Sequence, residues 1–279
     1  MGEKQQPTNW ICVSGGKDST AMLLWTLDEN LPNCRYIYAD TKFEHPELYT
    51  YLSYLEDKTG VKIERIESEG FIELAKRKGR FPSTVARFCT EQLKVLPMAK
   101  YIDAAEESDA DHPHLLYVGI RREESPARSR MGEVIYSKVN YPPRQVCHQL
   151  RHHPLLDWYS QDVFDIHRKF GIEPNPLYKM GMHRVGCFPC IMARHAELRT
   201  IFKRMPEMVD KIAGWEAEVQ AAAEAQGKTK EGSTLFSTAD YSFPMTGIRD
   251  LAAYLDTGQE LPGMEQDVGG CMSVYGLCE

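Results

Sequence analysis

Residues 14–20 have the composition of an anion-binding turn. They follow the apolar run 10–13 and precede a helical pattern that begins at Ala21. In order they are Ser14, Gly15, Gly16, Lys17, Asp18, Ser19 and Thr20. Paired glycines let the backbone approach a ligand closely, and the first N–H groups of a helix, with a lysine and three hydroxyl groups, favour negative charge. The order strand, glycine turn, helix therefore predicts a site for phosphate or pyrophosphate.

The spacing within this turn is not that of a Walker A loop. Ile11 and Asp18 stand where that motif requires a glycine and a Ser or Thr. An ordinary strand–helix turn with a capping Asp or Ser is the structural alternative. The convergence of two glycines, a lysine and three hydroxyl groups favours the ligand site.

A second group of charges follows the apolar run 115–120. Its arginines are Arg121, Arg122, Arg128 and Arg130. Arginine binds phosphate through two parallel hydrogen bonds, and ligands of parallel sheets gather at the carboxyl ends of strands. The cluster therefore predicts a second anion clamp across the crevice from residues 14–20, with a solvated charge run as the alternative. Asp40, which ends the apolar run 35–39, is expected to face the same ligand unless it caps a helix.

Residues 14–19 resemble the PP-loop of the adenine nucleotide α-hydrolase superfamily, and the wider chain resembles its phosphoadenosine-phosphosulfate (PAPS) reductase family. The resemblance extends from residue 10 to residue 195. Besides the turn, it is carried by Ala39–Thr41 with Pro46 and Glu47, Phe88–Thr90 through Lys94 and Pro97, Val118–Arg128, and Pro154–Trp158 through Cys190.

The resemblance implies that ATP or PAPS is bound, with Mg²⁺ near Asp18 or Asp40. A nucleophile would attack the α-phosphate in line while pyrophosphate leaves, so that catalysis would consist of positioning and charge stabilisation. The implied catalytic residues are Lys17, Asp18, Arg121 and Arg128. The implied nucleotide-binding residues are Ser14, Gly15, Gly16, Lys17, Asp18, Ser19, Thr20, Asp40, Gly119, Arg121, Glu124, Ser125 and Arg128.

The cysteines indicate metal or redox chemistry. Cys187 and Cys190 form a Cys-x-x-Cys knuckle, and Cys271 and Cys278 lie near the carboxyl end. These four thiolates would close one Zn²⁺ or [4Fe-4S] site. A competing set is Cys89, Cys187 and Cys190, with a cluster near the nucleotide and one iron open; reduced free thiols are the third alternative. Related reductases have two adjacent cysteines where this chain has Cys89 and a threonine.

Three activities are compatible with the resemblance. The first is cleavage of ATP to AMP and pyrophosphate, with an acceptor activated for sulfur insertion. The second is PAPS or adenylylsulfate reduction. The tail argues against it, because Cys278 lies in Gly-Leu-Cys-Glu where the family's reductases have Glu-Cys-Gly followed by Ile or Leu and His. The third is a nucleotide-binding accessory protein, such as a phage or CRISPR-associated homologue.

The hydrophobic pattern predicts the elements that position these motifs. Strands are expected at 10–13, 35–39, 61–66 and 115–120, and helices at 46–59, 71–78, 90–106 and 160–170. Alternating strands and helices with short connections predict an α/β fold with a doubly wound, mostly parallel sheet, Rossmann-like, over residues 1–195. Residues 196–279 are predicted to form a mainly helical, cysteine-bearing region, broken at Pro206. Residues 132–149 are predicted to be a loop-rich insertion.

Bulk properties limit the partners. The chain has 279 residues and a net charge of −7, which gives no general attraction for a polyanion. It has no apolar run near the roughly 20 residues that span a bilayer. Its amino end lacks the apolar core of a secretory signal. We therefore expect a cytoplasmic protein with an adenine nucleotide as partner and no membrane. A sulfur donor, a nucleic-acid acceptor and a homodimer stay open.

Overall fold

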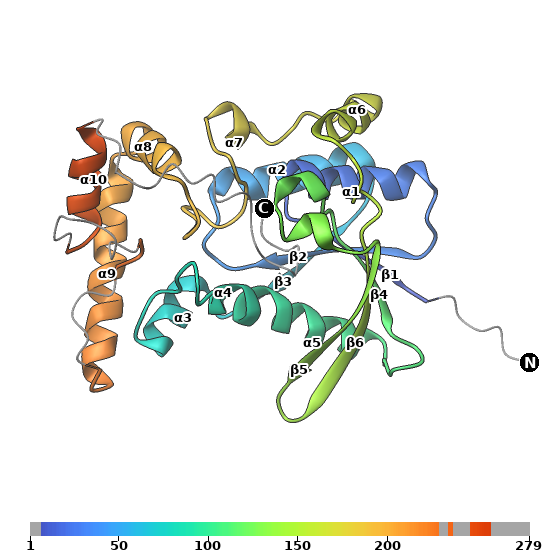
Figure 1. The fold of residues 1–279 in the computed structure, drawn as a ribbon, viewed down its shortest axis with the longest axis horizontal. Coiled ribbons are helices and arrows are strands. Elements are labelled where there is room, and N and C mark those ends of the chain that lie inside the picture. The colour runs from blue at the N-terminus through green and yellow to red at the C-terminus, as the bar shows by residue number, and fades with distance from the viewer. Residues whose placement is uncertain (1–6, 229–233, 237–245, 258–279) are drawn as a thin grey trace, which may run out of the picture.

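The computed structural model describes residues 7–228, 234–236 and 246–257. Its centre is a six-stranded sheet of order β3-β2-β1-β4-β6-β5 (Figure 1). The strands are β1 (Asn9–Cys12), β2 (Cys34–Asp40), β3 (Ile63–Glu67), β4 (His114–Tyr117), β5 (Val134–Tyr141) and β6 (Gln145–His152). All neighbouring pairs are parallel except β5 and β6. The predicted mostly parallel α/β sheet is therefore confirmed.

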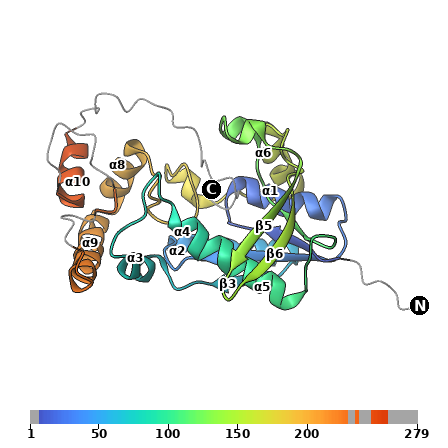
Figure 2. The same cartoon turned by 60° about the horizontal axis from the view of Figure 1, so that its bottom comes forward.

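Helices cover both faces of the sheet (Figures 1 and 2). One layer contains α1 (Lys17–Asp28), α2 (Pro46–Thr59), α6 (Ser160–Phe170) and α7 (Pro176–Lys179). The other contains α3 (Phe71–Lys78), α4 (Phe88–Thr90), the π-helical turn η1 (Glu91–Val95) and α5 (Leu96–Ala105). Alternation along β1 explains the two layers, because Ile11 packs with α1 and α2 whereas Trp10 and Cys12 pack with α5.

Local sequence signals set the ends of these helices. Helix α2 begins with Pro46 at its first turn and ends at Gly60, whose φ of 73° is the left-handed conformation that terminates helices. Two short 3₁₀ turns, η2 (Arg122–Glu124) and η3 (Arg128–Arg130), follow β4. They carry the arginine cluster from the carboxyl end of that strand.

The prediction of a loop-rich insertion at 132–149 is wrong. These residues form most of an antiparallel hairpin, in which Val134 pairs with His152 and Tyr141 with Gln145. β6 extends the main sheet beside β4. The pattern is hidden in the sequence because β5 is an edge strand whose outer positions are exposed, so it lacks a continuous apolar run.

The C-terminal region is helical, as predicted, and lies beside α3 (Figure 1). It contains α8 (His195–Arg204), α9 (Glu207–Ala225) and α10 (Ile248–Asp256), and Pro206 separates the first two. Buried residues of α9 join the same apolar core as those of α3. The Trp215 ring lies 4.9 Å from that of Phe43, which follows β2. The domain boundary at residue 195 stays a prediction.

None of the helices in the described part of the chain has the length and apolar character needed to cross a membrane.

Candidate active site

Residues 14–16 follow β1 and residues 17–20 form the first turn of α1, so the helix begins four residues before the predicted start at Ala21. The segment is stabilised by its own hydroxyl groups. The backbone N–H and the hydroxyl of Ser14 donate to Ser19 Oγ at 3.1 and 2.9 Å, and Ser19 Oγ donates to the Gly16 carbonyl at 3.1 Å. Gly15 has a φ of 77°, and a Cβ there would overlap Leu48 Cδ1. Only glycine fits this position, because both the conformation and the space exclude a side chain.

Asp18 is the electrostatic centre of the site. It is fully buried, and Lys17 Nζ and Arg121 Nε each donate to one of its carboxylate oxygens. Burial by itself would raise the pKa of Asp18, but the charges of Lys17 and Arg121 outweigh it and hold the pKa below its ordinary value. Arg121 also donates to Glu123. These side chains form a charge network that keeps Asp18 ionised at neutral pH.

The end of β4 packs directly on the start of α1. A Cβ on Gly119 would lie 2.7 Å from the Asp18 carbonyl oxygen. This contact and the Asp18–Arg121 ion pair join the two segments that the sequence predicts to face one another across a crevice. The crevice therefore depends on a glycine at position 119, since any side chain there would push the segments apart.

A pocket open to solvent lies at the carboxyl ends of β1, β2 and β4, the edge of a parallel sheet where ligands bind. We call it the nucleotide pocket. It is lined by Cys12, Val13, Ser14, Ser19, Ile37, Tyr38, Ala39, Glu44, Lys94, Met98, Gly119 and Gly186. Three of these, Ser14, Ser19 and Gly119, belong to the predicted nucleotide-binding set. The other predicted residues lie behind or beside the lining, and their roles stay predictions.

Several polar lining residues were missed by sequence reasoning. The buried Tyr38 hydroxyl has no hydrogen-bond partner among the residues that the structure describes. Glu44 accepts hydrogen bonds from the Thr41 hydroxyl at 2.6 Å and the Phe43 N–H at 2.9 Å, and burial raises its pKa. Tyr38 could have been found by the signal that predicted Asp40, because both residues lie near the carboxyl end of β2. Glu44 carries no such local signal, and Lys94 is marked only as part of the stretch that resembles the PAPS reductase family.

The remaining members of the predicted clamp stabilise the loop after β4. Arg128 is buried and paired with Glu124, and its backbone N–H donates to Ser125 Oγ at 3.2 Å. Glu124 also accepts the Arg121 N–H at 2.7 Å.

Asp40, at the end of β2, accepts the Lys42 N–H at 2.8 Å and the Tyr49 hydroxyl at 2.9 Å, and it remains partly exposed. Contact of these residues with a phosphate stays a prediction.

Three residues that lie 150 or more positions away in the sequence anchor the turn from the layer of α6 and α7. The Lys17 N–H donates to the Tyr178 hydroxyl at 3.0 Å, and His167 Nε2 lies 2.9 Å from the Lys17 carbonyl oxygen. Asn175 Nδ2 donates to the Gly15 carbonyl at 3.3 Å. Burial lowers the pKa of His167, so the neutral ring can donate to that carbonyl. Sequence reasoning missed all three anchors.

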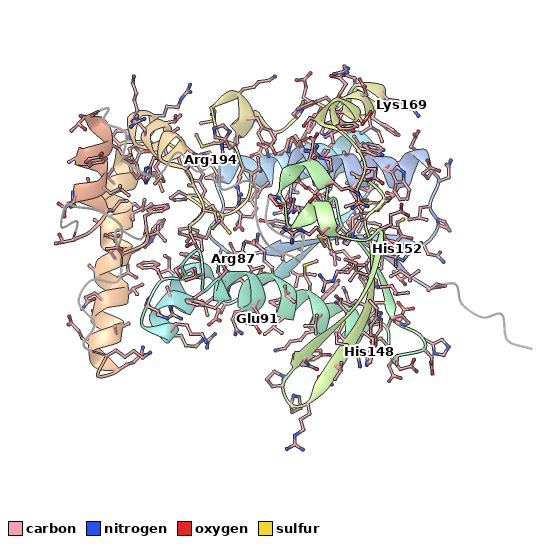
Figure 3. The ribbon with its side chains drawn as sticks, viewed as in Figure 1. Arg87, Glu91, His148, His152, Lys169 and Arg194 are labelled. Atoms are coloured by element: carbon pink, nitrogen blue, oxygen red, sulfur yellow. The ribbon has the colours of Figure 1, made fainter. Side chains whose placement is uncertain are left out.

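Three cysteines line a second pocket. We call it the cysteine pocket. It is lined by Thr41, Phe71, Arg87, Cys89, Thr90, Leu93, Lys94, Arg184, Val185, Cys187, Pro189, Cys190, Ile191 and Met192. It contains the complete three-cysteine set predicted from the sequence and shares Lys94 with the nucleotide pocket. Cys271 and Cys278 of the four-cysteine set lie outside the described residues. Arg87 and Arg194, labelled in Figure 3, come from the segments around α4 and α8 on this side of the molecule.

The spacing and environment of these thiols narrow their chemistry. The Thr41 hydroxyl lies 3.5 Å from Cys187 Sγ, and burial raises the pKa of the Cys187 thiol. The three sulfur atoms, all within the described part of the chain, are not mutually within 4.8 Å. A single zinc ion with Zn–S bonds of about 2.3 Å would hold its sulfur ligands roughly 3.8 Å apart. The observed spacing is therefore wider than a mononuclear site requires.

The fold and the two pockets define an α/β protein of the PP-loop class, with its site at the carboxyl ends of parallel strands. Residues 8–193 match the family model of the phosphoadenosine phosphosulfate reductase domain. The match covers more than half of the 279 residues, so the chain belongs to this family of enzymes.

Individual proteins are similar to this chain over different shares of its length. An uncharacterized 37.8 kDa protein of Escherichia phage 186 is 32% identical over 97% of this chain and 96% of its own length. The adenosine 5'-phosphosulfate reductase of Geobacillus kaustophilus is 23% identical over 61% of this chain and 67% of its own. The PAPS reductase of Candida auris in complex with phosphate is 15% identical, with a TM-score of 0.47 over 66% of this chain and 83% of that chain.

Proposed function

We propose that this chain binds ATP in the nucleotide pocket and cleaves it between the α- and β-phosphates, giving pyrophosphate and either AMP or an adenylylated acceptor. The observation that carries the proposal is the contact between the glycine turn and the end of β4, through Gly119 and the Asp18–Arg121 pair. Two segments with anion-binding residues then border one pocket. Membership of the PAPS reductase family supports the same assignment.

The charge network gives the turn residues distinct roles. Lys17 is the most accessible cation of the network, with 24% of its side chain exposed, and would turn from Asp18 to the leaving pyrophosphate. Arg121 is buried and held by Asp18 and Glu123, so we assign it mainly to orienting Asp18. Stabilising charge on a leaving group in this way typically contributes a factor of about 10²–10³ to the rate.

The donor sets of the two pockets differ in how well they fit the cofactors that the family implies. Both oxygens of Asp18 are already bound by cations, whereas Asp40 is partly exposed, so Asp40 fits Mg²⁺ better. Mg²⁺ would neutralise phosphate charge. The wide spacing of Cys89, Cys187 and Cys190 fits an iron–sulfur cluster better than Zn²⁺. Such a cluster would supply sulfur or redox chemistry next to the nucleotide.

Incubation of the pure protein with Mg-ATP, followed by separation of the products, tests the proposal. AMP and pyrophosphate are expected, and ADP or unchanged ATP would refute it. Lys17→Ala should lower turnover about 10²-fold or more while the protein stays folded. Lys169→Ala is a matched control, because Lys169 pairs with Asp28 on the far end of α1. Unchanged turnover in Lys17→Ala would remove the turn from its assigned role.

PAPS or adenylylsulfate reduction is the second candidate, favoured by the similarity to an adenosine 5'-phosphosulfate reductase. Release of sulfite from PAPS in the presence of thioredoxin would establish it. Tight ATP binding without either activity would instead favour a nucleotide-binding accessory protein. The similar protein of Escherichia phage 186 supports only the phage source of such a homologue.

A further inference from the structure

Three metal-ligating side chains meet at the amino end of β4, away from both pockets. They are Asp103 near the end of α5, His114 at the start of β4, and Cys147 in β6. One ligand atom of each lies within 4.8 Å of the other two, and no other such trio of His, Cys, Asp or Glu occurs among the residues that the structure describes. His114 is 4% exposed and Cys147 is fully buried. The end of α5, the start of β4 and the middle of β6 thus converge on one point.

Neighbouring polar groups fix the orientation of these side chains. The Tyr141 hydroxyl donates to Asp103 Oδ2 at 2.6 Å, and the Ser108 hydroxyl donates to Oδ1 at 3.1 Å. His114 Nε2 lies 2.6 Å from Asp103 Oδ1, while its Nδ1 lies 3.9 Å from Glu106 Oε2. A carboxylate behind the second histidine nitrogen is the usual support of a metal-bound imidazole.

We propose that Asp103, His114 and Cys147 bind one Zn²⁺ ion, through Oδ1, Nε2 and Sγ, with water in the fourth position. Imidazole, thiolate and carboxylate together suit zinc rather than Mg²⁺ or Ca²⁺. Tetrahedral bonds of about 2.0–2.3 Å separate ligand atoms by roughly 3.3–3.8 Å. Asp103 Oδ1 and His114 Nε2, now 2.6 Å apart, therefore need to separate by less than about 1 Å.

The protons balance in this binding step. The Cys147 thiol releases its proton to solvent and becomes the thiolate ligand. The neutral His114 ring, which donates its Nε2 proton to Asp103 in the metal-free protein, gives up that proton and takes one on Nδ1, facing Glu106, by exchange with solvent. The ring keeps one proton in total and presents the Nε2 lone pair to the ion. No electron is transferred, and the ion replaces the hydrogen bond between Asp103 and His114.

The position of the ion indicates a structural clamp. It would join α5 to β4 and β6, which lie side by side in the fold (Figures 1 and 2). Figure 3 labels His148, which directly follows Cys147, on the β5–β6 hairpin. The start of the same helical segment supplies Lys94 and Met98 to the nucleotide pocket. Gly119 lies five residues along from His114, about 16 Å at strand geometry, so the ion would stabilise a wall of that pocket without touching a ligand in it.

A cobalt titration of the full chain tests the proposal. The metal-free protein would carry Cys187→Ser and Cys190→Ser, which remove the knuckle as a competing thiolate site. We expect one equivalent of Co²⁺ to bind with a thiolate-to-cobalt absorption band in the near ultraviolet, and Zn²⁺ to displace it and raise the melting temperature by several degrees. Cys147→Ser and His114→Gln in this background should abolish the band or weaken binding at least 100-fold.

Cys34→Ser is the matched control, because Cys34 is a half-buried thiol at the start of β2, on the other side of β1 from β4. It should keep the cobalt band. The same band and stoichiometry in Cys147→Ser would overturn the proposal, since the ion would then lie elsewhere. An unaltered melting temperature with Zn²⁺ in the parent protein would also overturn it, whether or not the variants fold, and would leave a hydrogen-bonded network of Asp103, His114 and Tyr141.

Discussion

The nucleotide pocket and the cysteine pocket share Lys94 but differ in the kinds of residue that surround them. Beside the first, the cations Lys17 and Arg121 share the buried carboxylate of Asp18 in one network. The second is lined by three thiols and mostly apolar side chains, with three basic residues, and burial raises the pKa of the Cys187 thiol. The first site thus rests on paired buried charges, whereas the second places neutral thiols beside basic side chains.

This difference shows how each site would respond to its ligand. A buried charge network is preorganised, but each member depends on its partners, because removing one leaves an uncompensated charge. A buried thiol is inert as a ligand until it loses its proton, which a bound metal promotes. Stability should therefore respond strongly to changes beside the nucleotide pocket and weakly to changes in the metal-free cysteine pocket.

The largest effect is expected for Asp18→Ala. The change leaves Arg121 buried without its main partner, and we expect the free energy of unfolding to fall by about 3–5 kcal/mol. Asp28→Ala at the other end of α1 breaks only the exposed pair with Lys169 and should cost less than about 1 kcal/mol. Urea unfolding of both variants measures the difference. Equal losses would contradict the charge network.

The residues around the nucleotide pocket could be predicted from the sequence because their signals lie in continuous stretches. Residues 14–20 carry strand end, glycine turn and helix start in one stretch, and Gly119 follows an apolar run. The anchors Tyr178 and His167 contact Lys17 only through folding, so no local pattern marks them. Contacts between segments that are distant in the sequence leave no periodic pattern from which they could be predicted.

Local sequence patterns were also insufficient for the cysteine pocket and for the β5–β6 hairpin. The spacing of Cys187 and Cys190 identified the knuckle, whereas Cys89, nearly a hundred residues away, joined the predicted set through the family resemblance and not through any local spacing. The β5–β6 hairpin escaped detection because the outward face of its edge strand is exposed. Its Cys147 then meets Asp103 and His114 without any motif in the sequence.

The contact between the two halves of the nucleotide site is tested by Gly119→Ala. The added Cβ would lie 2.7 Å from the Asp18 carbonyl oxygen, a backbone atom that cannot turn away. We expect a loss of about 1–3 kcal/mol in unfolding free energy, together with weaker nucleotide binding. The control is Gly214→Ala in α9, where a Cβ meets nothing within 4 Å. It should instead stabilise the helix by about 0.5–1 kcal/mol. Wild-type stability in Gly119→Ala would mean that the segments do not touch.

The thiol of Cys12, which lines the nucleotide pocket, makes the free energy of unfolding depend on pH. Burial raises the pKa of Cys12 from 9.0 to about 12, against the lowering effect of Arg151. Because the folded state then holds its proton more tightly than the unfolded chain, this contribution is complete below pH 9 and is lost as pH rises towards 12. The loss approaches about 1.4 kcal/mol per pH unit in that window. Cys12→Ala should flatten the alkaline part of the stability curve by this amount, and an unchanged slope would place the thiol in water.

The smallest expected effect concerns the link between the two pockets. Tyr178 lies on the segment that leads to the cysteine knuckle, and its hydroxyl accepts the Lys17 N–H at 3.0 Å. Tyr178→Phe leaves that N–H without this acceptor and should cost about 0.5–1.5 kcal/mol. Tyr54→Phe is the matched control, because its hydroxyl accepts the Glu173 N–H at an exposed site where water can replace it. If the hydroxyl only stabilises the turn, ATP binding and stability will fall together. A fall in stability without any change in ATP binding would show that the turn keeps its shape without this anchor, and that the two pockets are mechanically independent.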